Sequence, residues 1–233
     1  MTTVAVIQAR NTSTRLPGKV VLPLAGVPVV THIAERMKAT DGVDVVCAAI
    51  PDSPGQEPLA ELVESLDGVV LVRGPEDDIL RRFAMAAEQT QADIVLRLFA
   101  DCPAIDCGIA ANLIAVHVER GGALTEVSDD SGYPWGYECQ AISVEALMAA
   151  NGIDLSANER EDFPAGFARY PDRFPMSRVY RPAGSSKLQI LLDTPADYEK
   201  LNGIFEALYP VDPLFGFEAV ETLARERPEL FAN

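Results

Sequence analysis

The stretch Gln8-Ala-Arg-Asn-Thr-Ser-Thr-Arg-Leu-Pro-Gly-Lys19 decides how the fold of this chain is interpreted. It follows an apolar run at residues 4–7 that predicts a first, buried strand. Within it, Arg10, Arg15 and Lys19 stand among small and hydroxyl side chains. Guanidinium and backbone N–H groups match phosphate oxygens, and open α/β sheets bind ligands beyond the carboxyl ends of their strands. The stretch therefore predicts a phosphate-binding loop, with an ordinary solvated loop as the alternative.

Two common phosphate motifs are absent from this stretch. A P-loop requires glycine five residues before the Gly-Lys pair and Ser or Thr after it, whereas Ser13 and Val20 hold those positions. The dinucleotide-binding pattern G-x-G-x-x-G does not follow the strand either. The predicted phosphate site is therefore of another type.

The composition narrows the class of ligand. The chain has 233 residues, 48% of them hydrophobic, and its 35 acidic and 19 basic residues give a formal net charge of −16. This acidity argues against nucleic acid and anionic membranes as partners, and favours a small anionic ligand held together with a metal ion. We see no 18-residue apolar run, no signal-peptide pattern and no paired CxxC arrangement. We therefore expect a cytoplasmic protein with reduced thiols.

Apolar periodicity predicts strands and helices that alternate along the first half of the chain. Expected strands are residues 4–8, 43–50, 69–72 and 93–99, and expected helices are residues 29–37, 57–66, 76–90 and 105–120. This alternation is typical of βαβ units and a mostly parallel sheet. In the second half we expect strands at residues 123–127, 139–143, 176–180 and 188–192, and helices at residues 196–208 and 217–227. We interpret residues 1–233 as one domain, in which residues 125–180 form an inserted lid or dimerisation arm.

Two acidic residues follow predicted strands. Asp101 comes just after the strand at residues 93–99, and Asp193 follows the strand at residues 188–192. Each could simply cap the next helix. Together with the basic loop, however, they form a set that suits Mg²⁺, which takes one or two protein carboxylates and fills its octahedron with phosphate oxygens.

The quoted stretch also carries a family resemblance. Gln8-Ala9-Arg10 and the run Ser13 to Lys19 resemble the N-terminal signature of the cytidylyltransferases that make CMP-activated sugars. These include the CMP-Kdo and CMP-acylneuraminate synthetases and the spore coat polysaccharide biosynthesis branch, to which this chain is most similar. Over about residues 4–210, the resemblance implies a three-layer α/β/α, Rossmann-like fold of the nucleotide-diphospho-sugar transferase type. It implies that the loop binds the CTP triphosphate through the following residues: Ala9, Arg10, Asn11, Arg15, Gly18 and Lys19.

The two acidic segments are similar to family motifs as well. Asp101-Cys-Pro-Ala-Ile-Asp106 resembles the segment Gly-Asp-Cys-Pro-Leu-Ile-Asp, and residues 192–197 resemble Val-Asp-Thr-Pro-Glu-Asp. The resemblance implies that Asp101 and Asp193 hold a catalytic Mg²⁺, and that Arg15, Lys19 and Asp101 take part in catalysis. Phe99 and Ala100 replace the family's usual Thr-Gly, which leaves the choice of base open.

Other matches are weaker. Arg73-Gly74 resembles an Arg-Gly turn that implies contact with the base or ribose, although Arg73 could instead pair with the acidic residues at 76–78. Glu138 and Gln140 stand where the family has Asp and Glu in its acceptor-sugar region. Residues 158–162 lack the family's His-Val-Thr. The acceptor pocket is therefore expected to differ from that of the better matched relatives.

The working hypothesis is a magnesium-dependent cytidylyltransferase that transfers CMP from CTP to a sugar or sugar-acid acceptor and releases pyrophosphate. The resemblance implies a role in cell-surface polysaccharide synthesis and a homodimer. A nucleotidyltransferase using another nucleotide and a sugar phosphate, or a non-catalytic nucleotide-binding homologue, are the alternatives. His32 and His117 lie in predicted helices and are interpreted as packing or surface residues.

Overall fold

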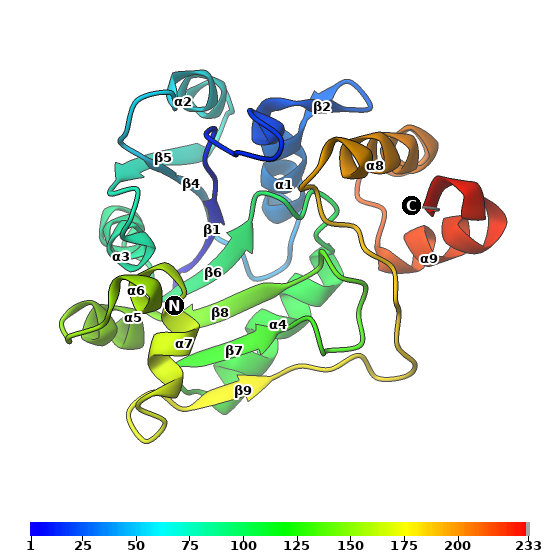
Figure 1. Cartoon of the computed structure of the whole chain (residues 1–233). Coiled ribbons are helices and arrows are strands. Elements are labelled where there is room, and N and C mark those ends of the chain that lie inside the picture. Colours follow the sequence, from blue (N-terminus) through cyan, green and yellow to red (C-terminus); the bar gives the residue numbers. More distant parts are fainter. Residues whose placement is uncertain (232–233) are drawn as a thin grey trace.

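A seven-stranded sheet forms the centre of the molecule in the computed structural model, which describes residues 1–231 (Figure 1). The strands, in the order in which they lie side by side, are β5 (Val69–Gly74), β4 (Val45–Pro51), β1 (Thr3–Gln8), β6 (Ile94–Phe99), β8 (Cys139–Ser143), β7 (Leu124–Val127) and β9 (Met176–Arg178). The first four are parallel, β8 is antiparallel to both neighbours, and β9 is parallel to β7. A separate hairpin pairs β2 (Pro23–Leu24) with β3 (Val27–Pro28). The predicted α/β class with a mostly parallel mixed sheet is confirmed.

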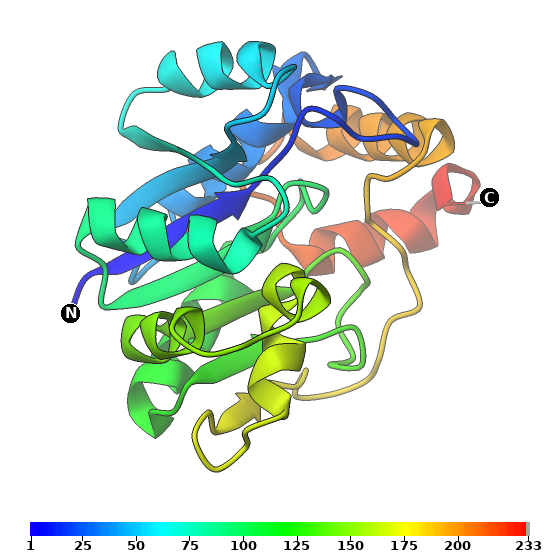
Figure 2. The ribbon, with the colours of Figure 1, turned by 60° about the vertical axis from the view of Figure 1, so that its left-hand side comes forward.

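Helices pack on both faces of this sheet (Figure 2). One face is covered by α1 (Val29–Lys38), α2 (Glu57–Glu64), α4 (Cys107–Arg120), α8 (Pro195–Leu208) and α9 (Phe217–Glu226). The opposite face is covered by α3 (Ile79–Thr90), α5 (Val144–Asn151) and α7 (Phe163–Ala168), with the short α6 (Ala157–Glu161) beside α3. Two short 3-10 turns complete the list, η1 (Lys19–Val21) and η2 (Pro228–Phe231).

The first strand shows why the sheet is buried on both sides. Ala5 and Ile7 belong to the core under α1 and α4, whereas Val4 and Val6 belong to the core under α3 and α5. Successive side chains of a strand point to opposite faces, so a continuous apolar run fits a strand covered by helices on both faces. The carboxyl ends of β1, β4 and β6 therefore open at one edge of the sheet, beside each other.

Two element predictions are wrong in detail. The helix expected at residues 76–90 begins only at Ile79, because Asp78 is its N-cap and accepts from the N–H of Arg81. The strand expected at residues 188–192 does not join the sheet. It is part of an extended connection, residues 181–194, which runs from β9 to α8 along one side of the molecule and makes a single β-bridge, Trp135 to Gln189 (Figure 1). We call this connection the strap.

Residues 144–168, where the sequence predicts no helix, contain α5, α6 and α7. All three are short, so each offers little periodicity to read. The assignment of residues 125–180 to a lid or dimerisation arm stays a prediction.

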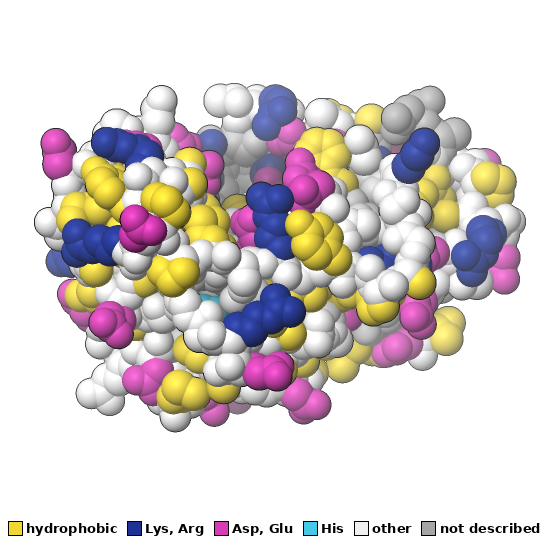
Figure 3. Space-filling model, turned by 90° about the horizontal axis from the view of Figure 1, so that it is seen from below, with side chains coloured by type: hydrophobic (Ala, Val, Ile, Leu, Met, Phe, Trp, Pro, Cys, Tyr) yellow, Lys and Arg dark blue, Asp and Glu magenta, His cyan; other side chains and the backbone are white. Residues whose placement is uncertain are grey.

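The surface mixes charge types. On the face seen in Figure 3, acidic, basic and hydrophobic side chains of the described residues are interspersed. Within residues 1–231, every helix is too short or too polar to cross a membrane. The four cysteines are unpaired.

Candidate active site

The cationic loop after β1 is held in place by a residue far along the chain. Gln56 is fully buried; its Oε1 accepts from the N–H of Asn11 at 2.8 Å, and its Nε2 donates to Thr12 Oγ1 at 3.2 Å. The loop closes where the N–H of Gly18 donates to the carbonyl of Asn11 at 3.0 Å. Gly18 has φ +70°, a left-handed conformation that suits glycine, and η1 starts directly after it with Lys19.

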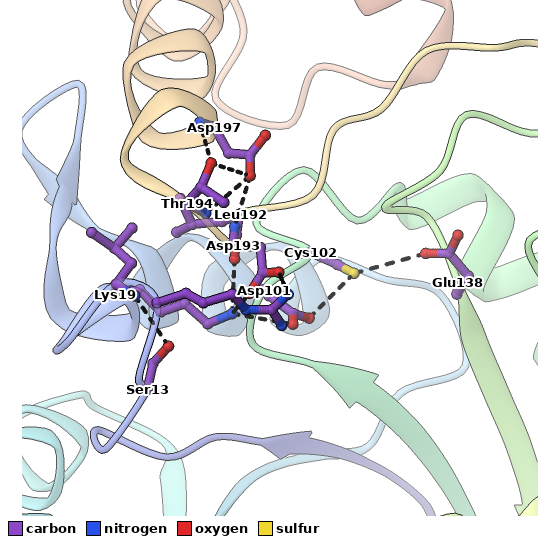
Figure 4. Close-up of polar contacts among 11 residues, drawn as sticks. Ser13, Lys19, Asp101, Cys102, Glu138, Leu192, Asp193, Thr194 and Asp197 are labelled. Atoms are coloured by element: carbon purple, nitrogen blue, oxygen red, sulfur yellow. Dashed lines mark hydrogen bonds and ion pairs between the residues drawn. The ribbon is translucent and has the colours of Figure 1, made fainter.

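Lys19 joins the loop to both acids singled out from the sequence. Its Nζ lies 3.3 Å from Asp101 Oδ2, 3.3 Å from Asp193 Oδ1 and 2.8 Å from the carbonyl oxygen of Leu192 (Figure 4). Arg15 Nη1 contacts the other oxygen of Asp193 at 2.6 Å. The Lys19 side chain is only 12% exposed, so these contacts form in a protected setting where charge interactions are stronger than in open water. Three segments distant in sequence thus converge on one cluster.

Neither Asp101 nor Asp193 caps a helix, although helix capping was the alternative interpretation of both residues. The N-cap of α4 is Asp106, whose Oδ1 accepts from the N–H of Ile109. The N-cap of α8 is Thr194, which forms a capping box with Asp197. Because neighbouring residues satisfy the helix ends, the carboxylates of Asp101 and Asp193 remain available to the cluster.

The strap positions Asp193, and it is held by backbone hydrogen bonds to the loop that contains Trp135 rather than to the sheet. The N–H of Trp135 donates to the carbonyl of Leu188 at 2.9 Å, and the N–H of Ile190 donates back to the carbonyl of Trp135 at 2.7 Å. The N–H of Leu192 then donates to the carbonyl of Asp101 at 2.8 Å, which places the two acids side by side.

A cavity of about 490 Å³ opens at the cluster. Its lining combines the loop, the strand ends, α3 and α6, and includes Gln8, Ala9, Arg10, Ser13, Thr14, Arg15, Lys19, Glu76, Asp77, Arg82, Phe99, Ala100, Asp101, Asn158, Glu161 and Asp193. Burial lowers the pKa of Arg82 to about 10, so this guanidinium stays charged at neutral pH. Such a volume with cations and acids on its wall suits a polar, phosphorylated small molecule.

Two further predicted residues, Glu138 and Gln140, do not line the cavity. Glu138 accepts from the N–H of Gly136 at 2.8 Å, and Cys102 Sγ stands 3.8 Å from Asp101 Oδ1 and 3.9 Å from Glu138 Oε2. Burial raises the pKa of Glu138, and the neighbouring Asp101 carboxylate raises it further. Gln140 accepts from Arg97 Nη1 at 3.2 Å.

Arg73 and Gly74 lie away from the cavity in this structure. Arg73 Nη2 is 3.6 Å from Glu57 Oε1, so its carboxylate neighbour is on α2 rather than among residues 76–78. Gly74 packs under α3, where an added Cβ would stand 3.1 Å from Met85 Sδ. In this region Glu76, Asp77 and Arg82 line the cavity, and Arg82 was not among the predicted site residues. The sequence carries one indication of this position: Arg82 lies on the helix that directly follows an acidic turn.

The donor set of the cluster fits Mg²⁺. Asp101 Oδ2 and Asp193 Oδ1 lie at the same distance from a single ammonium nitrogen, so both oxygens reach one cation-sized position. No group of three or more His, Cys, Asp or Glu side chains is arranged for a metal anywhere in residues 1–231. Two carboxylates without a third protein ligand match a Mg²⁺ ion that takes its other ligands from phosphate and water.

The fold is that of solved nucleotidyltransferases. The whole chain superposes on a cytidylyltransferase from Leptospira borgpetersenii with a TM-score of 0.92 and 24% identity, covering 100% of this chain and 98% of that one. A CMP:2-keto-3-deoxy-manno-octonic acid synthetase, solved in complex with CTP, has the same fold, with a TM-score of 0.67, 20% identity and coverage of 89% and 99%.

The family model described as "Cytidylyltransferase" matches residues 4–129, more than half of the chain, so this chain belongs to the cytidylyltransferase family. The spore coat polysaccharide biosynthesis protein SpsF of Bacillus subtilis is 23% identical over 86% of this chain and 85% of its own length. The 3-deoxy-manno-octulosonate cytidylyltransferase of Escherichia coli is 30% identical over 74% of this chain and 64% of its own length. The resemblance read from the sequence is thereby confirmed.

Proposed function

We propose that this protein is a magnesium-dependent cytidylyltransferase that transfers CMP from CTP to a sugar or sugar-acid acceptor and releases pyrophosphate. The observation that carries the proposal is the contact of Lys19 Nζ with Asp101 and Asp193, all three of which line the cavity. A cation from a phosphate-type loop and two acids on separate segments are the parts that phosphoryl and nucleotidyl transfer require, since catalysis there is mostly positioning and charge neutralisation.

The loop supplies the triphosphate site in this proposal. Arg10, which is exposed, and Arg15, whose side chain is 70% exposed, can move to meet phosphate oxygens. Backbone N–H groups at residues 12–15 would add neutral donors, and the left-handed turn at Gly18 would keep the backbone close to the ligand. The acceptor hydroxyl oxygen attacks the α-phosphorus, the bond to the β-phosphate oxygen breaks, and pyrophosphate and one proton are released.

Asp101 and Asp193 are the residues that would hold Mg²⁺. When bound, such an ion neutralises phosphate charge and acidifies a hydroxyl near it. Lys19 occupies the space between the two carboxylates, so in this scheme its ammonium turns from them to the leaving pyrophosphate when a nucleotide enters. Glu138, next to Asp101 through Cys102, and Gln140 belong to the acceptor side.

Two further expectations remain proposals. The name of the Bacillus relative supports a role in the synthesis of surface polysaccharide. A homodimer, with residues 125–180 as the contact region, is the expected assembly, and size-exclusion chromatography with light scattering measures it directly.

The test is pyrophosphate release from CTP with Mg²⁺ and a panel of sugars and sugar acids. Thermal shift with CTP, GTP, UTP and ATP runs beside it, because a ligand at a hundred times its Kd adds about 2.7 kcal/mol of stability. CTP is expected to give the largest shift. Stabilisation by CTP without pyrophosphate release from any acceptor would favour the non-catalytic alternative, and a larger shift with another nucleotide would overturn the choice of base.

A further inference from the structure

A row of polar side chains crosses the sheet beside the cavity. Arg97 on β6 donates from Nε to Gln8 Oε1 at 3.0 Å and from Nη1 to Gln140 Oε1 at 3.2 Å. Gln140 donates in turn to Glu126 at 3.3 Å, and Glu126 pairs with Arg178 at 2.9 Å. The row lies on the sheet face that α3, α5 and α7 cover, an otherwise apolar layer.

Arg97 is the unusual member of this row. It is 96% buried (relative exposure 4%), yet the side chains bonded to it are two neutral amides, and no ion pair with a carboxylate forms within residues 1–231. The rings of Phe163 and Phe99 lie 4.5 and 4.9 Å from its guanidinium carbon. Burial lowers the pKa of Arg97 to about 10, so the group is still a cation at neutral pH. The Asp162 carboxylate attracts Arg97 without a direct contact, so an anion bound nearer to the guanidinium would compensate more of the cost of its burial.

The bond to Arg97 determines which way the Gln8 amide points. A guanidinium group has no acceptor, so Gln8 must turn its oxygen toward Arg97. Its amide nitrogen, with two N–H donors, is then directed away from Arg97, and it has no partner among the described residues. Gln8 and Phe99 both line the cavity. The wall of the cavity therefore presents a fixed donor backed by a buried positive charge.

We propose that Gln8, oriented and charge-assisted by Arg97, binds an anionic group of the acceptor, a carboxylate or a phosphate. This inference rests on the proposed function, because it assigns one part of the same cavity to the acceptor. In this role Gln8 touches the ligand, and Arg97 is a positioning residue that acts through it.

The location favours the acceptor over the triphosphate. Gln8 pairs with Phe99 in the register of β1 and β6, and Phe99 stands two residues before Asp101. The acceptor hydroxyl must approach the α-phosphate beside Asp101, so an acid group on the same small molecule falls within reach of this part of the wall. The loop cations Arg15 and Lys19 already serve the phosphates of the nucleotide in the proposed scheme.

The test follows the side-chain amide signal of Gln8 by NMR in the ¹⁵N-labelled full-length protein. The signal is assigned by its loss in Gln8→Glu, which keeps the size and the contact with Arg97 but replaces the donor by an acceptor. CTP and Mg²⁺ are added first. Three probes follow: 3-deoxy-manno-octulosonate, which carries a carboxylate, glucose 1-phosphate, which carries a phosphate, and glucose, which is uncharged.

The expected result is a shift of the Gln8 signal with one of the anionic probes and none with glucose; the probe that acts identifies the group as carboxylate or phosphate. Gln8→Glu should lower the affinity for that probe by about tenfold or more, which is the scale of one charge-assisted hydrogen bond. The affinity for CTP should stay within about twofold. Gln89→Glu, the same change on the exposed surface of α3, is the matched control and should alter neither affinity.

Two results overturn the inference. One is a Gln8 signal that responds to CTP but to neither anionic probe, which would assign Gln8 to the nucleotide. The other is equal binding of the anionic probe by Gln8→Glu and by the control. Arg97→Lys adds a second check: it keeps a cation but loses the fixed Nε contact, so it should shift the Gln8 signal before any ligand is added. Failure of CTP to bind at all would instead count against the proposed function, and the anionic probes would still decide the role of Gln8.

Discussion

Asp101 and Asp193 face the same ammonium group, but the molecule supports them in different ways. Asp101 follows β6, a strand hydrogen-bonded on both sides within the sheet. Asp193 ends the strap, an extended segment that contacts the loop at residues 131–137 and the carbonyl of Asp101 through a few backbone hydrogen bonds. One acid is thus built into the rigid core, and the other is attached to it from outside.

The difference indicates which half of the site can adjust. A segment held by few hydrogen bonds opens more readily than a central strand. Ligand entry would therefore move Asp193 toward or away from Asp101, with the sheet as the fixed reference. Changes on the sheet side should abolish activity with the fold intact, whereas changes under the strap should act by displacing one acid.

The largest effect is expected for Lys19→Ala. The substitution removes the only side chain that contacts both acids in the described structure. It also removes the charge that the proposed mechanism assigns to the leaving pyrophosphate. Loss of one such group typically lowers turnover by about 100- to 1000-fold. Pyrophosphate release at saturating CTP measures it, and Lys187→Ala, an exposed lysine on the strap, is the control. Equal turnover in the two variants would contradict the assigned role.

Gly136→Ala tests the strap. Gly136 has φ +109°, and an added Cβ would lie 2.7 Å from the carbonyl carbon of Ile190, so the strap has to shift and Asp193 with it. A backbone conformation of this kind costs an alanine about 1 to 3 kcal/mol before the clash is counted. Chemical denaturation and Mg²⁺-dependent turnover should both be impaired.

Gly184→Ala is the matched control for that change. Gly184 lies on the strap itself with φ +75°, but an added Cβ meets nothing within 4 Å. It should lose stability by about 1 kcal/mol and keep its activity. If both glycine variants lose activity to the same degree, the contact of Gly136 with the strap is not what positions Asp193.

A smaller effect is expected where the strap begins. Arg181 forms two hydrogen bonds to Glu221 of α9, at 2.7 and 2.9 Å, and these bonds lower the pKa of the Glu221 carboxyl. A lowered folded-state pKa means that the stabilisation is complete above the usual glutamate pKa and is lost as pH falls through the folded value. The free energy of unfolding should therefore decline on acidification less steeply in Glu221→Gln than in the unsubstituted protein. If the free energy of unfolding declines equally steeply with falling pH in both proteins, this ion pair does not contribute to the acid sensitivity.

The smallest effect is expected at α6, which forms part of the cavity wall. Glu159 completes the capping box of α6 with the N-cap Ser156 and pairs with Arg169, whose hydrogen bonds lower the Glu159 pKa to about 2. NMR titration of this carboxyl should give a midpoint near that value, and Arg169→Met should move it upward toward the ordinary glutamate value. Because the Arg169 side chain is half exposed, the pair is expected to contribute little, and Arg169→Met is expected to change activity little. A midpoint in the ordinary glutamate range would mean that Arg169 does not hold Glu159 of α6 by this ion pair.

The sheet side of the site was predictable from the sequence because its signals are local. An apolar run followed by a cationic, glycine-containing loop places Lys19, and the run before Asp101 places that acid at a neighbouring strand end. Asp193 was found as a residue, but the strand expected directly before it, at residues 188–192, is not part of the sheet. The pairing that holds it depends on Gly136 and Trp135, more than fifty residues away, and no local pattern reports such contacts.

Other contacts of the site could not be predicted from the sequence for the same reason. Gln56 anchors the cationic loop from a turn before α2, where an isolated glutamine carries no periodic signal. The Gln8 and Arg97 pair is visible only once β1 and β6 are known to be adjacent. Sequence reasoning therefore located the residues of the cluster, and the tertiary structure was needed to find what holds and orients them.

The central claim is that Asp101 and Asp193 act on one bound ion. Its most direct test is the Mn²⁺ affinity of the CTP-saturated protein, measured by electron paramagnetic resonance for Asp101→Asn, Asp193→Asn and the double variant. If the acids share one ion, each single change should weaken binding by about tenfold or more, which is at least 1.4 kcal/mol, and the double variant should fall well short of the sum. Strictly additive losses, or a single variant with undiminished affinity, would contradict the claim.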